Sequence, residues 1–231
     1  MALFVLLHSP LVGPLTWSLT ADELRGRGYD VVVPTLLTDP AGERPFWRQH
    51  VRHVAQAVAP FPRAPLVLVG HSGAGPLLPL LGAELGHPVQ SYLFVDSDLP
   101  RPDTSRLDLF ASPEEADAFR STVRDGLLPV WSEDSLRDVI ADLDLRRRFT
   151  AELTSLPLAV YEEPLPVPAD WPDALCGYIH LSPAYAAPAR LARSEGWGYY
   201  RLNAGHFHML VDPRAVADAL VCLGDELAAA A

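Results

Sequence analysis

One segment, residues 65–75, restricts the fold of this chain more than any other, because it joins an apolar strand to a turn of small residues. Residues 66–69 are all apolar, and the turn that follows reads GHSGAG over residues 70–75. Such a strand–turn–helix forces the serine into a strained conformation, since larger neighbours would collide with the sheet and the helix. The turn exposes the hydroxyl and directs the following N–H groups toward it. We therefore predict Ser72 as a nucleophile and the Gly73 N–H as an oxyanion donor; the alternative is a turn that merely contains a serine.

The rest of the chain alternates strand-like and helix-like segments, which is typical of βαβ units and a parallel sheet. We predict an α/β fold with a mostly parallel, doubly wound sheet of about six strands. The expected strands are residues 3–7, 29–34, 66–69, 92–95, 177–181 and 198–202, and the expected helices are residues 16–28, 46–59, 73–85, 184–195 and 213–229.

Residues 101–169 interrupt this alternation with helical periodicity and no predicted strand. Helices are expected at 113–125 and 132–154, followed by a proline-rich stretch. We interpret this region as a helical cap inserted in an α/β core formed by residues 1–100 and 170–231. Its aromatic residues are expected mainly to pack within the cap, with some lining a pocket above Ser72: Phe110, Phe119, Trp131, Tyr161 and Trp171.

A serine nucleophile needs a base, and the sequence LNAGHFHML at residues 202–210 offers two histidines. His206 follows Gly205 directly after the last predicted strand. The carboxyl ends of parallel strands meet at one edge of a sheet, so this loop is expected beside Ser72. His206 is preferred over His208, and a purely structural loop histidine is the alternative.

These features resemble the α/β-hydrolase superfamily over nearly the full chain, and its small esterases and hydroxynitrile lyases in particular. The resemblance is carried by the Ser72 turn, the order of Ser72 and His206, the cap, and the Asp212-Pro213 pair after His206. It is also carried by His8 at the end of the first strand and Trp17 nine residues later. It implies an α/β-hydrolase fold and a Ser-His-acid triad.

The family usually places the triad acid in the turn after the penultimate strand, but here that turn, residues 180–185, has no carboxylate. Some members take the acid from the end of the strand after the nucleophile helix, which in this chain is Asp96. We predict that Asp96 orients His206 and stabilises its imidazolium. Asp98 is the second choice, and a turn or helix-capping role is the alternative. Glu162 and Glu163, late in the cap, are outside candidates.

The second oxyanion donor is also unusual, because the family position two residues past His8 is Pro10, which has no N–H. Either Leu11 donates after a local shift, or the reaction needs less oxyanion stabilisation than ester hydrolysis. Ser9 occupies a position where lyases of the superfamily often carry threonine, although a strand-end serine bonded to its own backbone is the favoured interpretation. His8 is expected to fix this loop.

Composition limits the binding partners and the cellular location that we expect for this protein. A net charge of −11 argues against nucleic acid or an anionic membrane as a partner. No apolar stretch reaches the length of a membrane span, and no signal-peptide pattern is present, so a cytoplasmic protein is expected. No metal-ligand cluster, phosphate-binding loop or dinucleotide motif is found, and the two cysteines are expected to be buried. Oligomeric state is left open.

The leading prediction is a cofactor-independent serine hydrolase for an ester or thioester of a small to medium apolar acyl compound. In it Ser72 attacks, His206 shuttles the proton, Asp96 orients the histidine, and N–H groups at Gly73 and near Leu11 hold the oxyanion. The alternative is a lyase, dehydratase or cyclase that uses the same residues on a biosynthetic intermediate, a possibility motivated by Pro10 and Ser9. A binding module on the same fold is third, since fold alone does not fix function.

Overall fold

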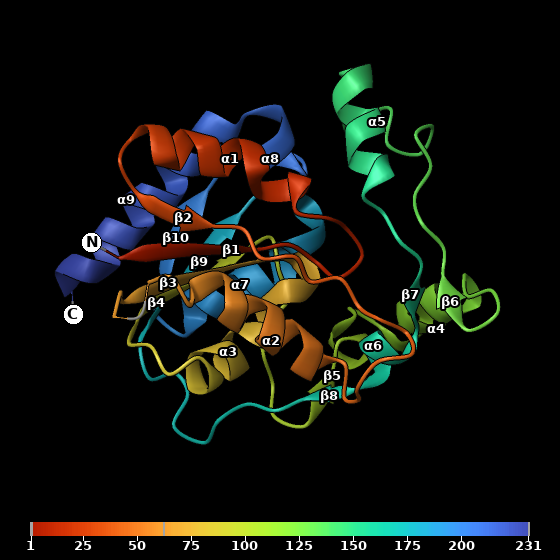
Figure 1. The fold of residues 1–231 in the computed structure, drawn as a ribbon, viewed down its shortest axis with the longest axis horizontal. Coiled ribbons are helices and arrows are strands. Elements are labelled where there is room, and N and C mark those ends of the chain that lie inside the picture. Colours follow the sequence, from red (N-terminus) through yellow and green to blue (C-terminus); the bar gives the residue numbers. More distant parts are fainter. Residues whose placement is uncertain (1, 62, 231) are drawn as a thin grey trace.

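The computed structural model describes residues 2–61 and 63–230, and its centre is a parallel sheet of six strands (Figure 1). The strands lie in the order β10-β9-β4-β3-β1-β2, and every pairing is parallel. The predicted fold class is therefore confirmed. The strand bounds are β1 Leu3–Leu7, β2 Asp30–Val32, β3 Leu66–His71, β4 Val89–Val95, β9 Leu175–His180 and β10 Gly198–Arg201.

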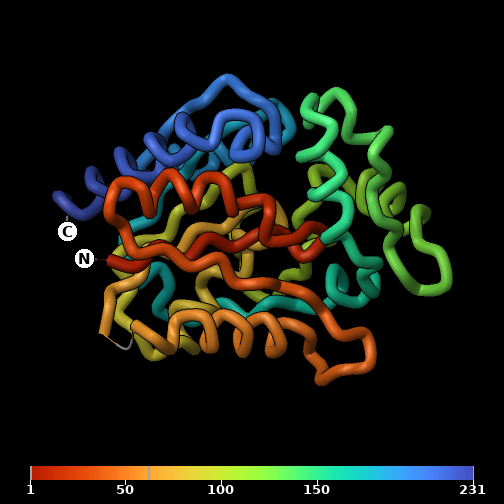
Figure 2. Tube along the Cα trace, turned by 45° about the horizontal axis from the view of Figure 1, so that its top comes forward, coloured from red at the N-terminus to blue at the C-terminus, as the bar shows by residue number. Residues whose placement is uncertain are grey.

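Helices cover both faces of the sheet, as expected for a doubly wound fold (Figures 1 and 2). One face carries α1 (Leu15–Gly26), α8 (His208–Val211) and α9 (Pro213–Ala230), and the other carries α2 (Trp47–Val58), α3 (Leu78–Glu84) and α7 (Ala186–Ser194). The short helix α8 was not predicted, because four residues are too few to show a helical period.

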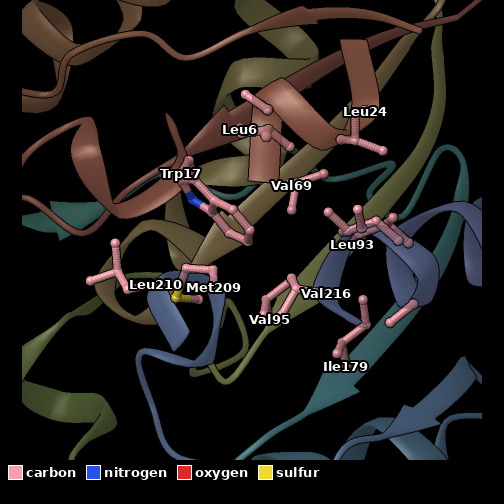
Figure 3. Packing of buried hydrophobic residues seen from close by; sticks show 14 of the residues in the cluster. Leu6, Trp17, Leu24, Val69, Leu93, Val95, Ile179, Met209, Leu210 and Val216 are labelled. Carbon is pink, nitrogen blue, oxygen red and sulfur yellow. The ribbon is translucent and has the colours of Figure 1, made fainter. Parts of the chain in front are cut away.

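The sheet is buried on both sides, which explains why its central strands are continuous apolar runs instead of alternating ones. Figure 3 shows the first layer, where Leu6, Val69 and Val95 of the strands meet Trp17 of α1 and Val216 of α9. The Trp17 indole N–H donates to the carbonyl of Leu7 over 3.0 Å, which satisfies a polar group that would otherwise be costly to bury.

The region 101–169 lies beyond one end of the sheet, on the right of Figures 1 and 2. It contains α4 (Pro113–Ser121), α5 (Leu143–Ala151) and α6 (Ala159–Glu162). The prediction that it has no strands is wrong: β5 (Thr104–Ser105) pairs with β8 (Pro164–Leu165), and β6 (Leu127–Leu128) pairs with β7 (Leu156–Pro157). Two-residue strands leave no alternation to detect in the sequence.

The long helix predicted at 132–154 is also wrong in its first half. The helix α5 starts only after Asp142, whose carboxylate accepts from the Leu145 N–H over 2.7 Å. An N-cap of this kind begins a helix, because it satisfies one of the N–H groups without a partner in the first turn. The residues before it form turns.

A six-residue 3₁₀ segment, Ser72–Leu77, separates β3 from α3. The predicted helix at 73–85 thus begins as a tighter helix and becomes α-helical at Leu78. Pro76 and Pro79 lack the N–H that an α-helix interior requires, and Pro79 is tolerated because it falls in the first turn of α3.

The strand order places a topological switch between β1 and β3. From β1 the chain goes to β2 at one edge of the sheet, and it then crosses to β3 on the opposite side of β1. Crevices at the carboxyl ends of strands beside such a switch are the usual ligand sites of open α/β sheets. Ser9 follows β1 and Ser72 follows β3, so both lie at this point.

Two smaller observations complete the fold. None of the helices in the described residues is long and apolar enough to cross a membrane. Cys176 is buried as predicted, but the prediction for Cys222 is wrong: it is exposed on α9, where its thiol contacts Glu226.

Candidate active site

The nucleophile candidate Ser72 lies at the carboxyl end of β3 with φ +55°, a conformation that residues other than glycine rarely adopt. The turn tolerates this because its neighbours are small. A Cβ on Gly70 would lie 2.8 Å from the Cα of Gly75, a distance at which the backbone would have to move. The small residues of the turn thus have the steric role that the sequence predicts.

The carbonyl of Ser72 is held by Ser97, a residue that sequence reasoning missed. Ser97 Oγ donates to this oxygen over 2.6 Å, and the Asp98 carbonyl, at 2.9 Å, is its other acceptor. Because a peptide group is planar and trans, fixing the Ser72 carbonyl also fixes the Gly73 N–H on the opposite side. Gly75 makes room for this contact, since a Cβ there would overlap Ser97 Oγ.

Asp96 and His206 meet as predicted, with 2.9 Å between Asp96 Oδ2 and His206 Nδ1. Asp96 is completely buried at the end of β4 and has φ +43°. Its other bonds come from the turn after β9: the N–H groups of Leu181 and Ser182 donate to Oδ1 over 2.9 Å, and the Ser182 hydroxyl donates to Oδ2 over 2.5 Å.

These bonds decide the charge of Asp96. Burial raises its pKa, but the hydrogen bonds from His206 and Ser182 outweigh burial and hold the pKa of the carboxyl below its ordinary value. The turn after β9, which has no carboxylate of its own, therefore supplies donors to a carboxylate on the neighbouring strand.

The other acid and base candidates lie elsewhere. Glu163 accepts from the N–H groups of Phe46 and Trp47 at the start of α2. Glu162 lies on the surface near Arg120. His208 begins α8 and contacts neither Ser72 nor Asp96 among the described residues. Asp98 lines the same pocket as Ser72 but forms no hydrogen bond with His206.

His71, directly before Ser72, packs against His206 and bonds to its backbone. Its Nε2–H donates to the His206 carbonyl over 2.9 Å, and the two rings lie 4.4 Å apart. Burial, with a smaller contribution from His206, lowers the pKa of His71 well below its ordinary value, so the ring is neutral.

Tyr185 contacts both the nucleophile and the base. Its hydroxyl is 3.2 Å from Ser72 Oγ, and its ring stacks on His206 at 5.0 Å with 8° between the planes. Within the described residues, Ser72 has no hydrogen bond to His206. Sequence reasoning missed Tyr185, although its place in the turn after β9 could have drawn attention to it.

The oxyanion candidates Ser9, Leu11 and Gly73 lie together. The Leu11 N–H points at Ser9 Oγ over 3.4 Å, and Ser9 Oγ lies 3.5 Å from the Tyr161 hydroxyl. A Cβ on Gly73 would be 2.9 Å from that hydroxyl and 3.2 Å from Ser9 Oγ, so the three residues border one small space.

His8 fixes the loop that carries Ser9. Its Nδ1–H donates to the Ser9 carbonyl over 2.9 Å, and its Nε2 accepts from the Leu36 N–H over 3.0 Å. Burial lowers the pKa of His8 to about 4, which keeps the ring neutral so that Nε2 can accept.

A cavity of about 480 Å³ opens above Ser72. Four of the five aromatics singled out from the sequence line it: Phe110, Phe119, Trp131 and Tyr161. Phe110, Phe119 and Tyr161 also pack together in a hydrophobic cluster, as expected, so packing and lining the pocket are not alternatives. Trp171 instead packs beside Tyr92 and Trp197. Periodicity identifies a buried helix face but does not say whether a cavity lies beside it.

Arg106 connects the Ser72 turn to the cap. Its guanidinium is buried, with Nε donating to the Gly73 carbonyl over 2.7 Å and Nη1 donating to the Val160 carbonyl over 3.0 Å. Sequence reasoning also missed this residue, because a single arginine in an irregular segment carries no pattern.

Residues 2–61 and 63–230 contain no cluster of three or more His, Cys, Asp or Glu side chains that could hold a metal ion.

The family follows from a comparison of the whole chain with known families. A model described as the alpha/beta hydrolase family matches residues 4–219. The chain belongs to this family. It is an enzyme of the α/β-hydrolase fold, a hydrolase, as the sequence resemblance implied.

Individual proteins resemble this alpha/beta hydrolase over nearly their whole length. A carbendazim hydrolyzing esterase from Nocardioides sp. (strain SG-4G) is 27% identical, and the match covers 97% of this chain and 100% of that protein. An extracellular alpha/beta-hydrolase from a Paenibacillus species has a TM-score of 0.78 at 19% identity, covering 97% and 99% of the two chains. Tomato methylketone synthase I, solved with 2-tridecanone, has a TM-score of 0.72 at 15% identity, covering 98% of each.

Proposed function

We propose that this alpha/beta hydrolase is a serine esterase or thioesterase in which Ser72, His206 and Asp96 act as the catalytic triad. The observation that carries the proposal is the 2.9 Å bond between Asp96 and His206 Nδ1, beside a serine held at φ +55°. The resemblance to an esterase over 97% of this chain and 100% of that protein supports the reaction class.

In the proposed reaction, Asp96 holds the imidazole by Nδ1, which leaves Nε2 for the Ser72 hydroxyl. Substrate entry displaces the Tyr185 hydroxyl from Ser72, and the serine then turns to His206. Ser72 Oγ attacks the acyl carbon while His206 takes its proton. The imidazolium returns this proton to the departing alcohol or thiol, and a water molecule hydrolyses the acyl-enzyme by the same route in reverse.

The tetrahedral oxyanion needs donors aimed at it before the reaction begins. The Gly73 N–H is the first, and Ser97 fixes its peptide group. The second contact comes from the Leu11 N–H or the Ser9 hydroxyl, because Pro10 has no N–H. The Ser9 side chain rotates away from its long contacts with Leu11 and Tyr161. This rotation leaves the Leu11 N–H and the Ser9 hydroxyl free to donate to the oxyanion.

The cavity supports small to medium acyl compounds with an apolar portion. Its size is within the usual range of small-molecule sites, and its walls are aromatic and aliphatic apart from a few polar groups near Ser72.

The first experiment combines a fluorophosphonate probe with hydrolysis of short-chain aryl esters. Labelling is expected at Ser72, and Ser72→Ala is expected to abolish labelling and turnover together. His206→Ala should lower the labelling rate by at least about a thousandfold. The matched control His208→Ala, two residues along the same loop, should stay within about twofold of the wild type. Labelling that survives Ser72→Ala would overturn the proposal.

One observation favours a second candidate, a lyase or related non-hydrolytic reaction with the same residues. Ser72 donates or accepts a hydrogen bond with Tyr185 and not with His206, so His206 is free to take a proton directly from a substrate. Ester turnover that persists after Pro10→Gly at its wild-type rate supports hydrolysis. A gain of esterase activity of about tenfold or more in Pro10→Gly would support the second candidate.

A further inference from the structure

Asp98 is a carboxyl in the active-site pocket that the proposed triad does not use. It lies two residues after Asp96, is partly buried, and lines the same cavity as Ser72. Within residues 2–61 and 63–230 its carboxylate accepts no hydrogen bond and forms no ion pair. A carboxyl group that is partly buried without a protein partner loses part of its hydration without compensation.

The two arginine side chains near Asp98 donate their hydrogen bonds to other acceptors. Arg101 donates to the Asp108 carbonyl over 2.7 Å and lies on the surface. Arg106, the arginine of the pocket lining, donates to the carbonyls of Gly73 and Val160. Neither guanidinium therefore neutralises the Asp98 carboxylate through a direct contact.

The tyrosine hydroxyl groups near Asp98 also contact atoms other than its carboxylate. Tyr178 donates to the Ser97 carbonyl over 2.7 Å, Tyr161 contacts Ser9, and Tyr185 contacts Ser72. Burial, opposed by Arg101, raises the pKa of Asp98 to about 7, as expected of a carboxyl without donors. The carboxyl thus accepts no hydrogen bond from the described residues, and a ligand or solvent can supply the donor.

The charge of the surroundings favours a cationic donor over a neutral one. Glu115 also lines the cavity, so the lining contains two carboxyl groups, Asp98 and Glu115, and one guanidinium group, that of Arg106. The chain as a whole carries −11, which attracts cations to a cleft of this sign.

We propose that Asp98 recognises a protonated amine on the substrate, so that the enzyme acts on esters or thioesters whose apolar portion carries a basic nitrogen. This inference rests on the proposed function for the reaction but names the substrate class. The ammonium group donates to Asp98 while the apolar remainder contacts the aromatic wall of Phe110, Phe119 and Trp131.

A binding experiment tests this independently of turnover. The ligands are two methyl ketones that differ in one end group, dimethylammonium or the isosteric isopropyl, each prepared with two, three and four methylene groups in the chain. The protein is the Ser72→Ala variant, studied by titration calorimetry. A charge-assisted hydrogen bond predicts at least about tenfold tighter binding of one ammonium ketone than of its isopropyl partner.

Adding Asp98→Asn should reduce this preference to less than about threefold. Adding Asp103→Asn, the same change on the same loop but outside the cavity lining, should leave it intact. An ammonium preference that is absent, or that survives Asp98→Asn, overturns the inference whatever the ester assays show. Conversely, ester turnover that does not depend on Ser72 overturns the proposed function and not this preference.

A pH titration of binding keeps the test valid if Asp98→Asn fails to fold. Aliphatic amines stay protonated up to about pH 10, so affinity for the ammonium ketone should rise about tenfold between about pH 5.5 and 8.5 as Asp98 ionises. Affinity for the isopropyl ketone should change little. Repeating the titration with His206→Asn removes the imidazole of the pocket that is bonded to Asp96, while Glu115 and His71 of the lining stay in place. A flat profile for the ammonium ketone in that variant overturns the inference.

Discussion

The Ser97 hydroxyl donates a hydrogen bond of 2.6 Å to the carbonyl oxygen of Ser72. Ser97 lies just after β4 and Ser72 just after β3, so two adjacent strands cooperate to set one peptide group. That peptide carries the Gly73 N–H on its other side, where an oxyanion would form. Ser97 is thus a positioning residue for the proposed reaction.

Ser97→Ala should lower kcat for ester hydrolysis by about tenfold to a hundredfold while KM changes less than about threefold. The reason is that the Gly73 N–H loses its fixed direction, and oxyanion contacts act mainly in the transition state. Steady-state kinetics with a short-chain aryl ester provide the measurement.

The control for this prediction is Ser91→Ala, on β4, the strand that leads to Ser97. Ser91 is also completely buried, but its hydroxyl has no hydrogen-bond partner among the described residues. The substitution should leave kcat within about twofold. Equal losses in the two variants would show that Ser97 acts only through general stability.

Tyr185→Phe should increase the rate of fluorophosphonate labelling by about fivefold. The substitution keeps the ring that stacks on His206 but removes the hydroxyl that competes with His206 for Ser72. A neutral hydrogen bond contributes about 1 kcal/mol net, which corresponds to this factor. The labelling rate at fixed probe concentration gives the result.

Tyr199→Phe is the matched control, because its hydroxyl contacts His180 on the neighbouring strand and lies outside the cavity lining. It should label at the wild-type rate. A slower reaction of Tyr185→Phe would instead mean that the hydroxyl assists the attack of Ser72.

Asp96→Asn should lower kcat by about three to four orders of magnitude, since an amide neither fixes the correct tautomer of His206 nor stabilises its imidazolium. Asp173→Asn is the control: Asp173 also accepts a hydrogen bond, from Tyr92, but lies outside the active-site lining. It should keep turnover within about twofold. Comparable turnover of Asp96→Asn and the wild type would remove Asp96 from the triad.

The same carboxyl predicts a pH dependence of stability. The pKa of Asp96 is lowered in the folded protein, so its contribution to folding is present above the unfolded pKa of about 3.9 and is lost as the pH falls through the folded value. The difference in unfolding free energy between wild type and Asp96→Asn should therefore shrink below about pH 4. Urea titrations at several pH values measure it. A difference that grows toward acid pH would contradict the assignment.

The sequence predicted three residues that follow strand ends, Ser72, Asp96 and His206, because parallel strands bring them to one edge whatever the details of packing. It did not predict Tyr185 or Arg106. Their contacts depend on how an irregular turn and the region 101–169 are placed in space, and neither has a period to read. The carboxyl group of Asp98 could be proposed from sequence only as a triad acid, since its lack of partners is a property of the folded pocket.

Stability should respond in opposite directions to alanine at two buried glycines. A Cβ at Gly75 would overlap Ser97 Oγ and lie 3.0 Å from the Asp98 carbonyl, so Gly75→Ala should destabilise the fold by about 1–3 kcal/mol. A Cβ at Gly224, inside α9, meets only Phe4 Cζ at 3.9 Å. Gly224→Ala should stabilise the fold by about 0.5–1 kcal/mol, because alanine loses less backbone freedom in a helix.

Urea denaturation of the two variants separates packing at the Ser72 turn from a general intolerance of alanine. Gly75→Ala should also lose esterase activity, because the Ser97 hydroxyl must move away from the Ser72 carbonyl to accommodate the new methyl group. Gly224→Ala, remote from the cavity, should keep it. A Gly75→Ala variant with wild-type stability and turnover would mean that the close approach of Ser97 to the turn is not needed to hold the Gly73 N–H.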